Sequence, residues 1–424
     1  MLLRFGVTNH LSLRDRQELS LVASSLDDAP EGLIDCAHVP GDRLLPAIVI
    51  YGTNASGKSN LIDAIRWTKL AVQRSHSHGD PNEPIHRAPF ILDAACVLAP
   101  TQVEVDFVVG DVRYHYGFEA TDEAFVAEWL YSFPHDKRQV LFERQGLKFR
   151  FGRNLKGRNQ VISELTRPNS LFLSAAAQNR HEELSAIQKF FQSIQIDAEQ
   201  STGSSTLADQ LIGKDQDDRI VQFLSAAGTG IVGYQVEEQE LGERLQKMHD
   251  VINSVIKTHL GGPLTHDAMS HKRRSVKLAH KNKADENVYF EFERESMGTR
   301  RLMVLLVSVF RALDAGTPLI VDKLDASLHT HACELLFQLF ASRDTNPKGA
   351  QLIATTHDTN LLHAKCLRRD QVWFTEKDRE GATHLYPLTE FRTRKSDNLA
   401  RGYLQGRFGA IPFAGHVAEL MAGL

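Results

Sequence analysis

The sequence predicts an α/β fold with a mostly parallel sheet, an inserted antiparallel β lobe and a short helical arm. Three observations predict this fold. A glycine-rich loop joins an apolar run to a helical pattern near residue 52, two alternating runs follow within 101–119, and apolar runs alternate with helical patterns from residue 288 onward. Strands that alternate with helices form mostly parallel sheets, whose ligands lie at the carboxyl ends of the strands.

The first predicted unit is a strand, a loop and a helix. The strand covers 46–51, which is apolar and β-branched, and a helical pattern begins at Asn60. Residues 52–59 between them read GTNASGKS and fill every fixed position of the phosphate-binding pattern GxxxxGK[ST]. The pattern predicts a P-loop, whose backbone N–H groups point at phosphates in front of a helix N-terminus.

This P-loop predicts ATP and Mg²⁺ as cofactors. Two glycines let the backbone curl, Lys58 neutralises phosphate charge, and Ser59 offers a hydroxyl to Mg²⁺. The residues expected to hold the nucleotide are Gly52, Asn54, Gly57, Lys58, Ser59 and Asn60.

An antiparallel lobe is predicted around this unit. Runs at 2–7 and 17–22 are typical of strands, and 101–109 and 112–119 alternate between apolar and polar residues. Gly110-Asp111 between the last two runs indicates a hairpin turn.

The middle of the chain is predicted to be helical. Apolar residues recur at helical spacing within 174–194 and again within 236–257. We therefore expect an N-terminal half of the nucleotide-binding domain at 1–194, a helical insertion at 195–265 and a C-terminal half at 266–424. The basic run at 272–283 could contact nucleic acid phosphates or a partner, or it could be a solvated face.

The C-terminal half returns to alternating strands and helices. Strands are expected at 288–293, 318–321, 351–355 and 371–376, with helices at 299–313 and 329–342. The run Leu319-Ile320-Val321-Asp322 has the form of a Walker B strand, so Asp322 is expected to hold Mg²⁺. His357 follows the next strand, where its imidazole could bond the γ-phosphate or orient water.

Composition limits the class of protein. The chain has 424 residues, of which 42% are hydrophobic, and a formal net charge of −4, so no global attraction to nucleic acid is expected. Its four cysteines have no CxxC spacing, which argues against zinc or a disulfide framework. No signal-peptide core and no run of about 18 apolar residues is present. These features predict a soluble, cytoplasmic protein with no membrane contact.

The order of motifs resembles that of ABC-type ATPase heads of the SMC, RecF and OLD kind, over nearly the whole chain. The order is Walker A, antiparallel lobe, helical insertion, a Ser-x-Gly-Thr helix start, a Walker B aspartate and Thr356-His357-Asp358. Several segments more narrowly resemble prokaryotic AAA-family ATPases of the abortive-infection type. Members of that group occur in anti-phage systems, beside a separate toxin or nuclease subunit. The segments are Phe5–Asn9, Glu295–Leu302, Leu324–His329, Arg394–Asn398 and Tyr403–Pro412.

The resemblance assigns further roles. It implies that Ser296 and Gly298 form the signature that closes over ATP bound to an opposite protomer, so the chain would be a homodimer or higher homo-oligomer. It also implies that Asp325 is the D-loop residue and His357 the switch histidine. Gln178 is placed where such heads carry a Q-loop glutamine that contacts the metal.

Position 323 departs from the family. The family has a water-polarising glutamate after the Walker B aspartate, whereas this chain has Lys323. A protonated ammonium has donors but no acceptor, so Lys323 cannot take a proton from water. The lysine is either natural in a hydrolysis-poor member or a substitution that holds ATP in place.

Three functional hypotheses follow. The first is a sensor or regulatory ATPase in an anti-phage complex that controls a separate nuclease or toxin effector. The second is a DNA repair or recombination ATPase of the RecF type that clamps DNA directly. The third is a nucleotide-binding scaffold that does not hydrolyse ATP.

Overall fold

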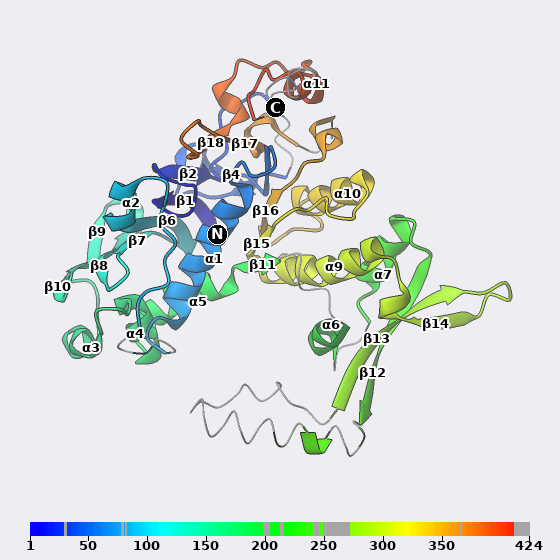
Figure 1. Cartoon of the computed structure of the whole chain (residues 1–424), viewed down its shortest axis with the longest axis horizontal. Helices are drawn as coiled ribbons and strands as arrows, with labels where there is room; N and C mark the ends of the chain where they lie inside the picture. Colours follow the sequence, from blue (N-terminus) through cyan, green and yellow to red (C-terminus); the bar gives the residue numbers. More distant parts are fainter. Residues whose placement is uncertain are drawn as a thin grey trace, which may run out of the picture. The chain divides into compact units, whose positions relative to one another are not determined.

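A computed structural model describes residues 1–28, 32–77, 80, 83–197, 204–212, 216–240, 242, 246–248, 251, 272–363 and 367–410 (Figure 1). The chain forms two compact units. The first contains 1–197, 311–325 and 329–424, and the second contains 198–310 and 326–328. Each unit is described by itself.

The first unit contains a six-stranded sheet in the order β11-β15-β16-β5-β17-β18. All neighbours are parallel except the β17–β18 hairpin at one edge. The strands are β5 (Ala47–Gly52), β11 (Gln195–Asp197), β15 (Pro318–Val321), β16 (Gln351–Thr355), β17 (Val372–Lys377) and β18 (Thr383–Pro387). Every residue of β5, β15 and β16 is buried, as expected for central strands of a parallel sheet. This confirms the predicted α/β fold class.

The antiparallel lobe is a seven-stranded sheet in the order β10-β9-β8-β7-β6-β1-β2. Its strands are β1 (Leu2–Thr8), β2 (Gln17–Ser20), β6 (Thr101–Val109), β7 (Val112–Ala120), β8 (Phe125–Phe133), β9 (Gln139–Gln145) and β10 (Lys148–Phe151). The predicted hairpin is present, because Val109 pairs with Val112 across Gly110-Asp111. A short pair, β3 (Ile34–Asp35) and β4 (Arg43–Leu44), lies between the two N-terminal elements and β5.

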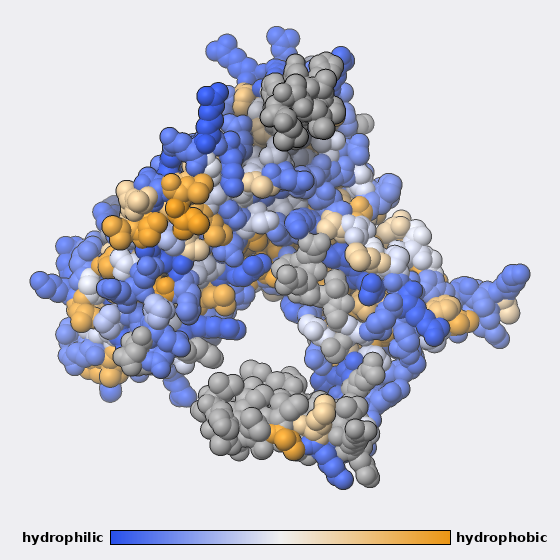
Figure 2. Space-filling view, in the orientation of Figure 1, coloured by the Kyte–Doolittle hydropathy of each residue, from blue (hydrophilic) through white to orange (hydrophobic). Residues whose placement is uncertain are grey.

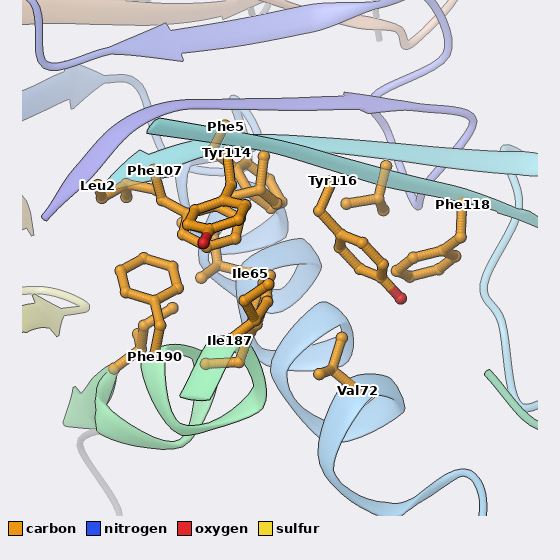
Figure 3. Packing of buried hydrophobic residues seen from close by; sticks show 14 of the residues in the cluster. Leu2, Phe5, Ile65, Val72, Phe107, Tyr114, Tyr116, Phe118, Ile187 and Phe190 are labelled. Atoms are coloured by element: carbon orange, nitrogen blue, oxygen red, sulfur yellow. The ribbon is translucent and has the colours of Figure 1, made fainter. Parts of the chain in front are cut away.

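One apolar core joins the antiparallel lobe to the P-loop helix. Helices α1 (Lys58–Arg74) and α5 (Glu182–Ser193) lie under the inner face of the sheet (Figure 3). The rings of Phe107 and Phe190 stack with centroids 4.5 Å apart. Ile65 of α1 and Ile187 of α5 enter the same cluster. The N-terminal strands therefore fix the helix that follows the phosphate loop.

The remaining helices of the first unit lie around these sheets. They are α2 (Ala94–Leu98), α3 (Asn159–Leu165), α4 (Phe172–Gln178), α10 (Thr330–Ala341) and α11 (Leu399–Leu404). The predicted helix at 174–194 is divided into α4 and α5. Arg180 interrupts it with a left-handed φ of 57°.

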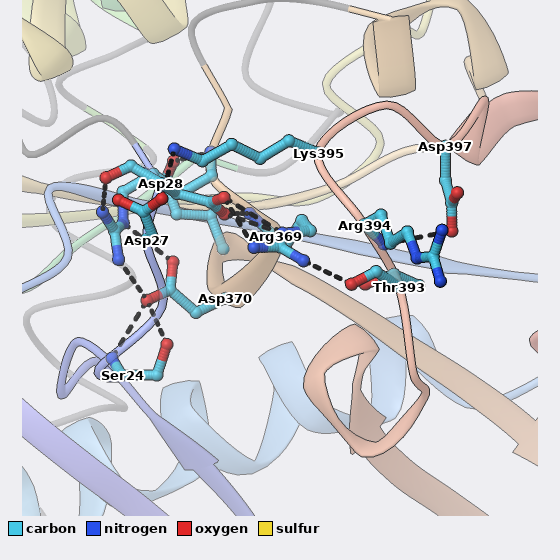
Figure 4. A network of polar contacts seen from close by, with 11 residues as sticks. Ser24, Asp27, Asp28, Arg369, Asp370, Thr393, Arg394, Lys395 and Asp397 are labelled. Carbon is cyan, nitrogen blue, oxygen red and sulfur yellow. Dashed lines mark hydrogen bonds and ion pairs between the residues drawn. The ribbon is translucent and has the colours of Figure 1, made fainter.

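The N-terminal and C-terminal segments meet in a polar network (Figure 4). The guanidinium of Arg369 donates to both carboxylate oxygens of Asp28, and Ser24 donates to Asp370 through its hydroxyl at 2.7 Å. Lys395, which belongs to the basic tail, pairs with Asp27 at 3.3 Å. Part of the family-like tail is thus bound to the start of the chain. The final motif residues Ile411 and Pro412 lie outside the described residues.

The second unit contains a three-stranded antiparallel sheet and corrects one prediction. Strand β12 (Ile231–Glu240) pairs with β13 (Lys272–Lys281), which pairs with β14 (Asn287–Glu291). The helix predicted from residue 236 is therefore wrong over 236–240. The described residues 246–248 and 251 are helical, as predicted. Helices α6 (Ser204–Leu211), α7 (Asp218–Ala226) and α9 (Met297–Ala315) also contribute, the last with its residues up to 310.

The units do not follow the predicted boundaries. The first boundary, at 194, is close to the observed end of a unit at Asp197. The second unit continues past residue 265 to Phe310, because β13 and β14 pair with β12. The signature segment thus belongs to the same unit as the insertion.

Candidate nucleotide-binding site

A cavity of about 250 Å³ lies at the carboxyl edge of the six-stranded sheet. Seven of its lining residues are consecutive residues of the P-loop and the start of α1, and three come from other segments. The lining residues are Asn54, Ala55, Ser56, Gly57, Lys58, Ser59, Asn60, Lys323, His357 and Lys377. This set has three lysines and no carboxylate, so the cavity suits an anion.

Close packing explains the two glycines of the P-loop. A Cβ on Gly57 would lie 2.1 Å from Thr383 Oγ1, and Gly57 has a left-handed φ of 107°. A Cβ on Gly52 would lie 2.4 Å from Thr375 Oγ1. A side chain at Gly57 would displace the Thr383 side chain, and one at Gly52 would also meet the Thr375 carbonyl oxygen of β17 at 2.5 Å.

A chain of hydroxyl groups supports the loop from below. Ser56 Oγ and Thr375 Oγ1 are 2.7 Å apart, and Thr383 Oγ1 donates to the Ser56 carbonyl at 2.8 Å. Ser12 Oγ lies 2.6 Å from Thr383 Oγ1 and accepts from Asn60 Nδ2 at 2.5 Å. Strands β17 and β18 and the loop after β1 thus hold the P-loop in place.

Lys58 lies within the curl of the loop. Its Nζ donates to the carbonyls of Gly52 at 2.8 Å and Thr53 at 2.9 Å. Burial lowers the pKa of Lys58 to about 8, the carboxylates of Asp322 and Asp325 oppose this, and Lys323 lowers the pKa further. An incoming polyanion would favour the charged ammonium.

Ser59 and Asp322 meet although 263 residues separate them. Ser59 Oγ donates to Asp322 Oδ2 at 2.7 Å, and Thr355 Oγ1 donates to the other carboxylate oxygen at 2.6 Å. Strand β16 carries Thr355 and lies between β15 and β5, so it orients the Asp322 carboxylate toward the P-loop. The two residues expected to hold Mg²⁺ are therefore in contact.

Lys323 lines the cavity in a left-handed backbone conformation, with φ of 54°. Its N–H donates to Thr355 Oγ1 at 2.7 Å, and the next N–H, of Leu324, donates to the Thr355 carbonyl at 2.8 Å. Thr355 of β16 therefore fixes the backbone turn at Lys323, whose side chain is exposed. The residue at this position faces the same cavity as Lys58 and His357.

His357 and Asp325 are joined through the backbone. The His357 N–H donates to Asp325 Oδ2 at 3.1 Å, so the residue expected to form the D-loop positions the backbone of the expected switch histidine. Partial burial and then the charge of Lys58 lower the pKa of His357 below its usual value. The lowered pKa favours the neutral imidazole, which can donate one hydrogen bond and accept another.

The residues expected to form the signature, Ser296 and Gly298, lie in the second unit. Ser296 caps α9, because its Oγ accepts from the Thr299 N–H at 3.1 Å. A Cβ on Gly298 would lie 2.4 Å from the carbonyl oxygen of Ser327, so only glycine fits there. The Glu295 carboxylate accepts from His280 Nε2 of β13 across 2.8 Å. Ser296 is exposed at the start of a 19-residue helix.

A family model described as "AAA domain, putative AbiEii toxin, Type IV TA system" matches residues 47–363. The match covers well over half of the chain. It contains both the P-loop and the switch segment.

The chain belongs to this AAA family. The abortive-infection resemblance seen in its motifs is thereby confirmed. The comparison with curated proteins gives no match. Among solved structures, the SMC head domain from Thermotoga maritima matches 91% of this chain and 98% of that chain, with 12% sequence identity and a TM-score of 0.37.

The structure of this AAA-family chain corrects the assignment of Gln178. Helix α4 begins at the far end of α1, where Leu171 N donates to Ser75 Oγ at 3.1 Å and His76 N donates to Ser174 Oγ at 3.3 Å. Sixteen helical residues separate Ser59 from Ser75, about 24 Å at 1.5 Å per residue, and α4 recovers only about 6 Å of this distance by residue 178. Gln178 is exposed and, at this distance along α1, is too far from Ser59 to share a metal ion with it.

Sequence reasoning missed three residues of the site in this AAA-family chain. Thr355 orients Asp322, Thr383 supports the loop, and Lys377 lines the cavity. The only signal was that Thr355 and Lys377 lie at ends of predicted strands. These residues reach the P-loop because β16 and β17 flank β5, and local sequence patterns do not predict the order of strands in a sheet.

Proposed function

We propose that this chain is an ATP-binding ABC-type ATPase that acts as the sensor or regulatory subunit of an anti-phage complex and controls a separate effector, such as a nuclease. The observation that carries the ATP assignment is the Ser59–Asp322 contact beside a cavity lined by three lysines. The AAA family supplies the ATPase class, and its description as an AbiEii toxin of a TA system supports a role in abortive infection.

The residues present fit a nucleotide with Mg²⁺. Gly52 and Gly57 leave room that a Cβ would fill, and the loop between them offers its N–H groups. We propose that Ser59 and Asp322 hold Mg²⁺, and that Lys58 binds the β- and γ-phosphates. When bound, Mg²⁺ would neutralise charge that develops on the transferring phosphoryl group.

Hydrolysis is proposed to be slow in this chain because of Lys323. Phosphoryl transfer to water depends mainly on positioning and electrostatics, with a carboxylate that polarises the water. Lys323 lies at the cavity, where the family has glutamate, and offers an ammonium instead. His357, which lines the same cavity, has a ring nitrogen that can accept a hydrogen bond. We therefore expect tight ATP retention with slow turnover.

A separate protein partner is supported by the surface of the first unit. Apolar side chains gather around α2 (Figure 2), where Ile91, Leu92 and Leu98 are 75%, 69% and 84% exposed. Asn9 of the family-like N-terminal motif holds this segment by donating to the carbonyls of Cys96 and Ala99. An exposed cluster of apolar side chains is typical of a protein interaction site.

A DNA clamp of the RecF type remains the alternative, and the charge pairing of β13 disfavours it. Four of the basic side chains of this strand have acidic partners: Lys272 and Arg274 pair with Glu238, Lys277 with Glu237, and Lys281 with Asp285. Basic groups that already pair with carboxylates are less able to replace the counterions of DNA phosphates, so they add little to the affinity for DNA.

Within the described residues, no helix is long and apolar enough to cross a membrane.

Co-expression with the neighbouring genes tests the proposal. We expect the chain to co-elute with a second protein that is toxic when it is freed, and ATP to be present in the complex. A P-loop variant, Lys58→Ala, is expected to lose the nucleotide and to change effector activity. A chain that elutes alone and whose ATPase, after Lys323→Glu, is stimulated by DNA would support the clamp instead.

A further inference from the structure

We propose that Lys377 is a nucleotide-binding residue that contacts the α-phosphate, on the side of the P-loop opposite the catalytic groups. The inference rests on the proposed function, because it assumes that the anion in the cavity is a nucleotide. Lys377 ends β17 and lines the same cavity as Lys58.

Strand order defines the two sides of the P-loop. Strand β5, which leads into the loop, lies between β16 on one side and β17 on the other, and β15 lies beyond β16. Asp322 and Lys323 follow β15, and His357 follows β16. Lys377 is on β17, three strand spacings or about 14 Å from β15.

The register places Lys377 at the level of the loop. Thr375 pairs with Gly52, the first residue of the P-loop, and Lys377 is two residues further on. Residues two apart on a strand share one face of the sheet, and Thr375 uses that face to bond Ser56. Glu376, on the opposite face, accepts instead from the Ala410 N–H at 3.0 Å.

The side chain of Lys377 is available to a ligand. It is exposed, and no carboxylate among the described residues forms an ion pair with it. The nearby Asp378 instead pairs with His384 at 3.1 Å and with Arg14 at 3.7 Å. The ammonium thus remains as a point charge at the rim of a cavity that has no lining carboxylate.

The nucleotide is oriented by the Ser59–Asp322 contact. These residues define the γ-phosphate end on the β15–β16 side. The phosphate that precedes the β-phosphate must then lie toward β17, where Lys377 is. ATP and ADP share the α- and β-phosphates and differ only in the γ-phosphate. A contact of Lys377 away from the γ-phosphate end would therefore contribute equally to the binding of both, whereas Lys323 and His357 face the γ-phosphate end.

Nucleotide titrations of the full chain test this inference. We expect Lys377→Ala to weaken ATP and ADP binding by a similar factor of about tenfold or more, as for loss of a charge-assisted contact. Lys377→Arg should retain most of the affinity, and Lys377→Glu should weaken it further. The control is Lys148→Ala, which removes an exposed lysine of β10 that does not line the cavity. Thermal unfolding of each variant checks that the fold is kept.

Two outcomes would overturn the inference. If Lys377→Ala and Lys377→Glu bind both nucleotides as the parent chain does, Lys377 makes no contact. If only ATP binding weakens, Lys377 meets the γ-phosphate instead. A parent chain that binds neither nucleotide is a different result, because it contradicts the proposed function itself.

Discussion

Single side chains decide the chemistry of this site. Thr355 shows how: its hydroxyl donates to Asp322 and accepts from the Lys323 N–H, so one residue fixes both the proposed Mg²⁺ ligand and the turn after it. The Asp322 carboxylate accepts from Ser59, while the side chain of Lys323 lines the cavity. Substitution at 323 therefore changes the chemical group at the cavity without changing the framework.

The first prediction concerns Lys323→Glu. A carboxylate at this position could accept a proton from water, so we expect the hydrolysis rate to rise by roughly 10²- to 10⁴-fold. The affinity for ATP should change much less, because Lys58, Ser59 and Asp322 are retained. Phosphate release and nucleotide titration measure the two quantities.

Lys323→Gln is the matched control for this prediction. It removes the positive charge without supplying a base, so it should not reproduce the increase. Brisk hydrolysis by the Lys323 form would show that the catalytic base lies elsewhere, with His357 as the first candidate at the cavity.

At the scale of elements, a buried charge holds α4 to the antiparallel lobe. Glu128 of β8 is fully buried and accepts from the N–H groups of Phe172 and Leu173 at 2.6 and 3.0 Å. Arg144 of β9 lies 3.5 Å from the carboxylate and donates to the Ser170 carbonyl at 2.6 Å. Burial raises the pKa of Glu128, and Arg144 and the two amides oppose this effect.

The second prediction is that Glu128→Ala lowers the free energy of unfolding by about 3–5 kcal/mol. The substitution leaves the Arg144 charge buried without its carboxylate and two helix-start N–H groups without an acceptor. Denaturant-induced unfolding measures the loss. Arg66→Gln, which breaks an exposed ion pair with Asp63, should cost at most about 1 kcal/mol. An equal, small loss in both variants would contradict the stabilising role of Glu128.

At the scale of the whole molecule, the residues expected to form the two halves of an ATP site lie on separate units. The first unit carries the P-loop, Asp322 and His357, and the second carries Ser296 and Gly298. We propose that the signature of one protomer meets ATP held by another. Slow hydrolysis would make such an assembly long-lived.

The third prediction is that ATP promotes dimerisation and that Ser296→Arg blocks it. Ser296 is exposed at the N-cap of α9, so arginine would remove the capping hydroxyl and add bulk where phosphate is expected. Mass measurement with and without ATP gives the oligomeric state. The control Ser25→Arg places the same side chain at an exposed site of the first unit. A parent chain that stays monomeric with saturating ATP would exclude this mode of assembly.

The sequence alone determined those features that depend on neighbouring residues. The P-loop is contiguous, and its glycines and lysine have fixed spacing. The strands at 101–109, 318–321 and 351–355 were predicted with the boundaries that are observed. Alternation of apolar and polar residues predicts a strand with one buried face, and a short continuous apolar run predicts a strand buried on both faces. Asp322 was predicted as the Walker B aspartate from its place at the end of such a run, and strand β15 does end directly before it.

Tertiary structure decided what depends on pairing between distant segments. Residues 236–240 were predicted as helix, because the helical spacing that begins at Leu241 was extended backwards, but they pair with 272–276 on β13. Gln178 was assigned from its place along the chain, whereas its position in space depends on where α4 packs against α1. Lys377 could be placed at the cavity only from the order of strands, because β17 is the neighbour of β5. Local patterns specify elements, but the order of strands, set by packing of the whole core, determines which side chains share a site.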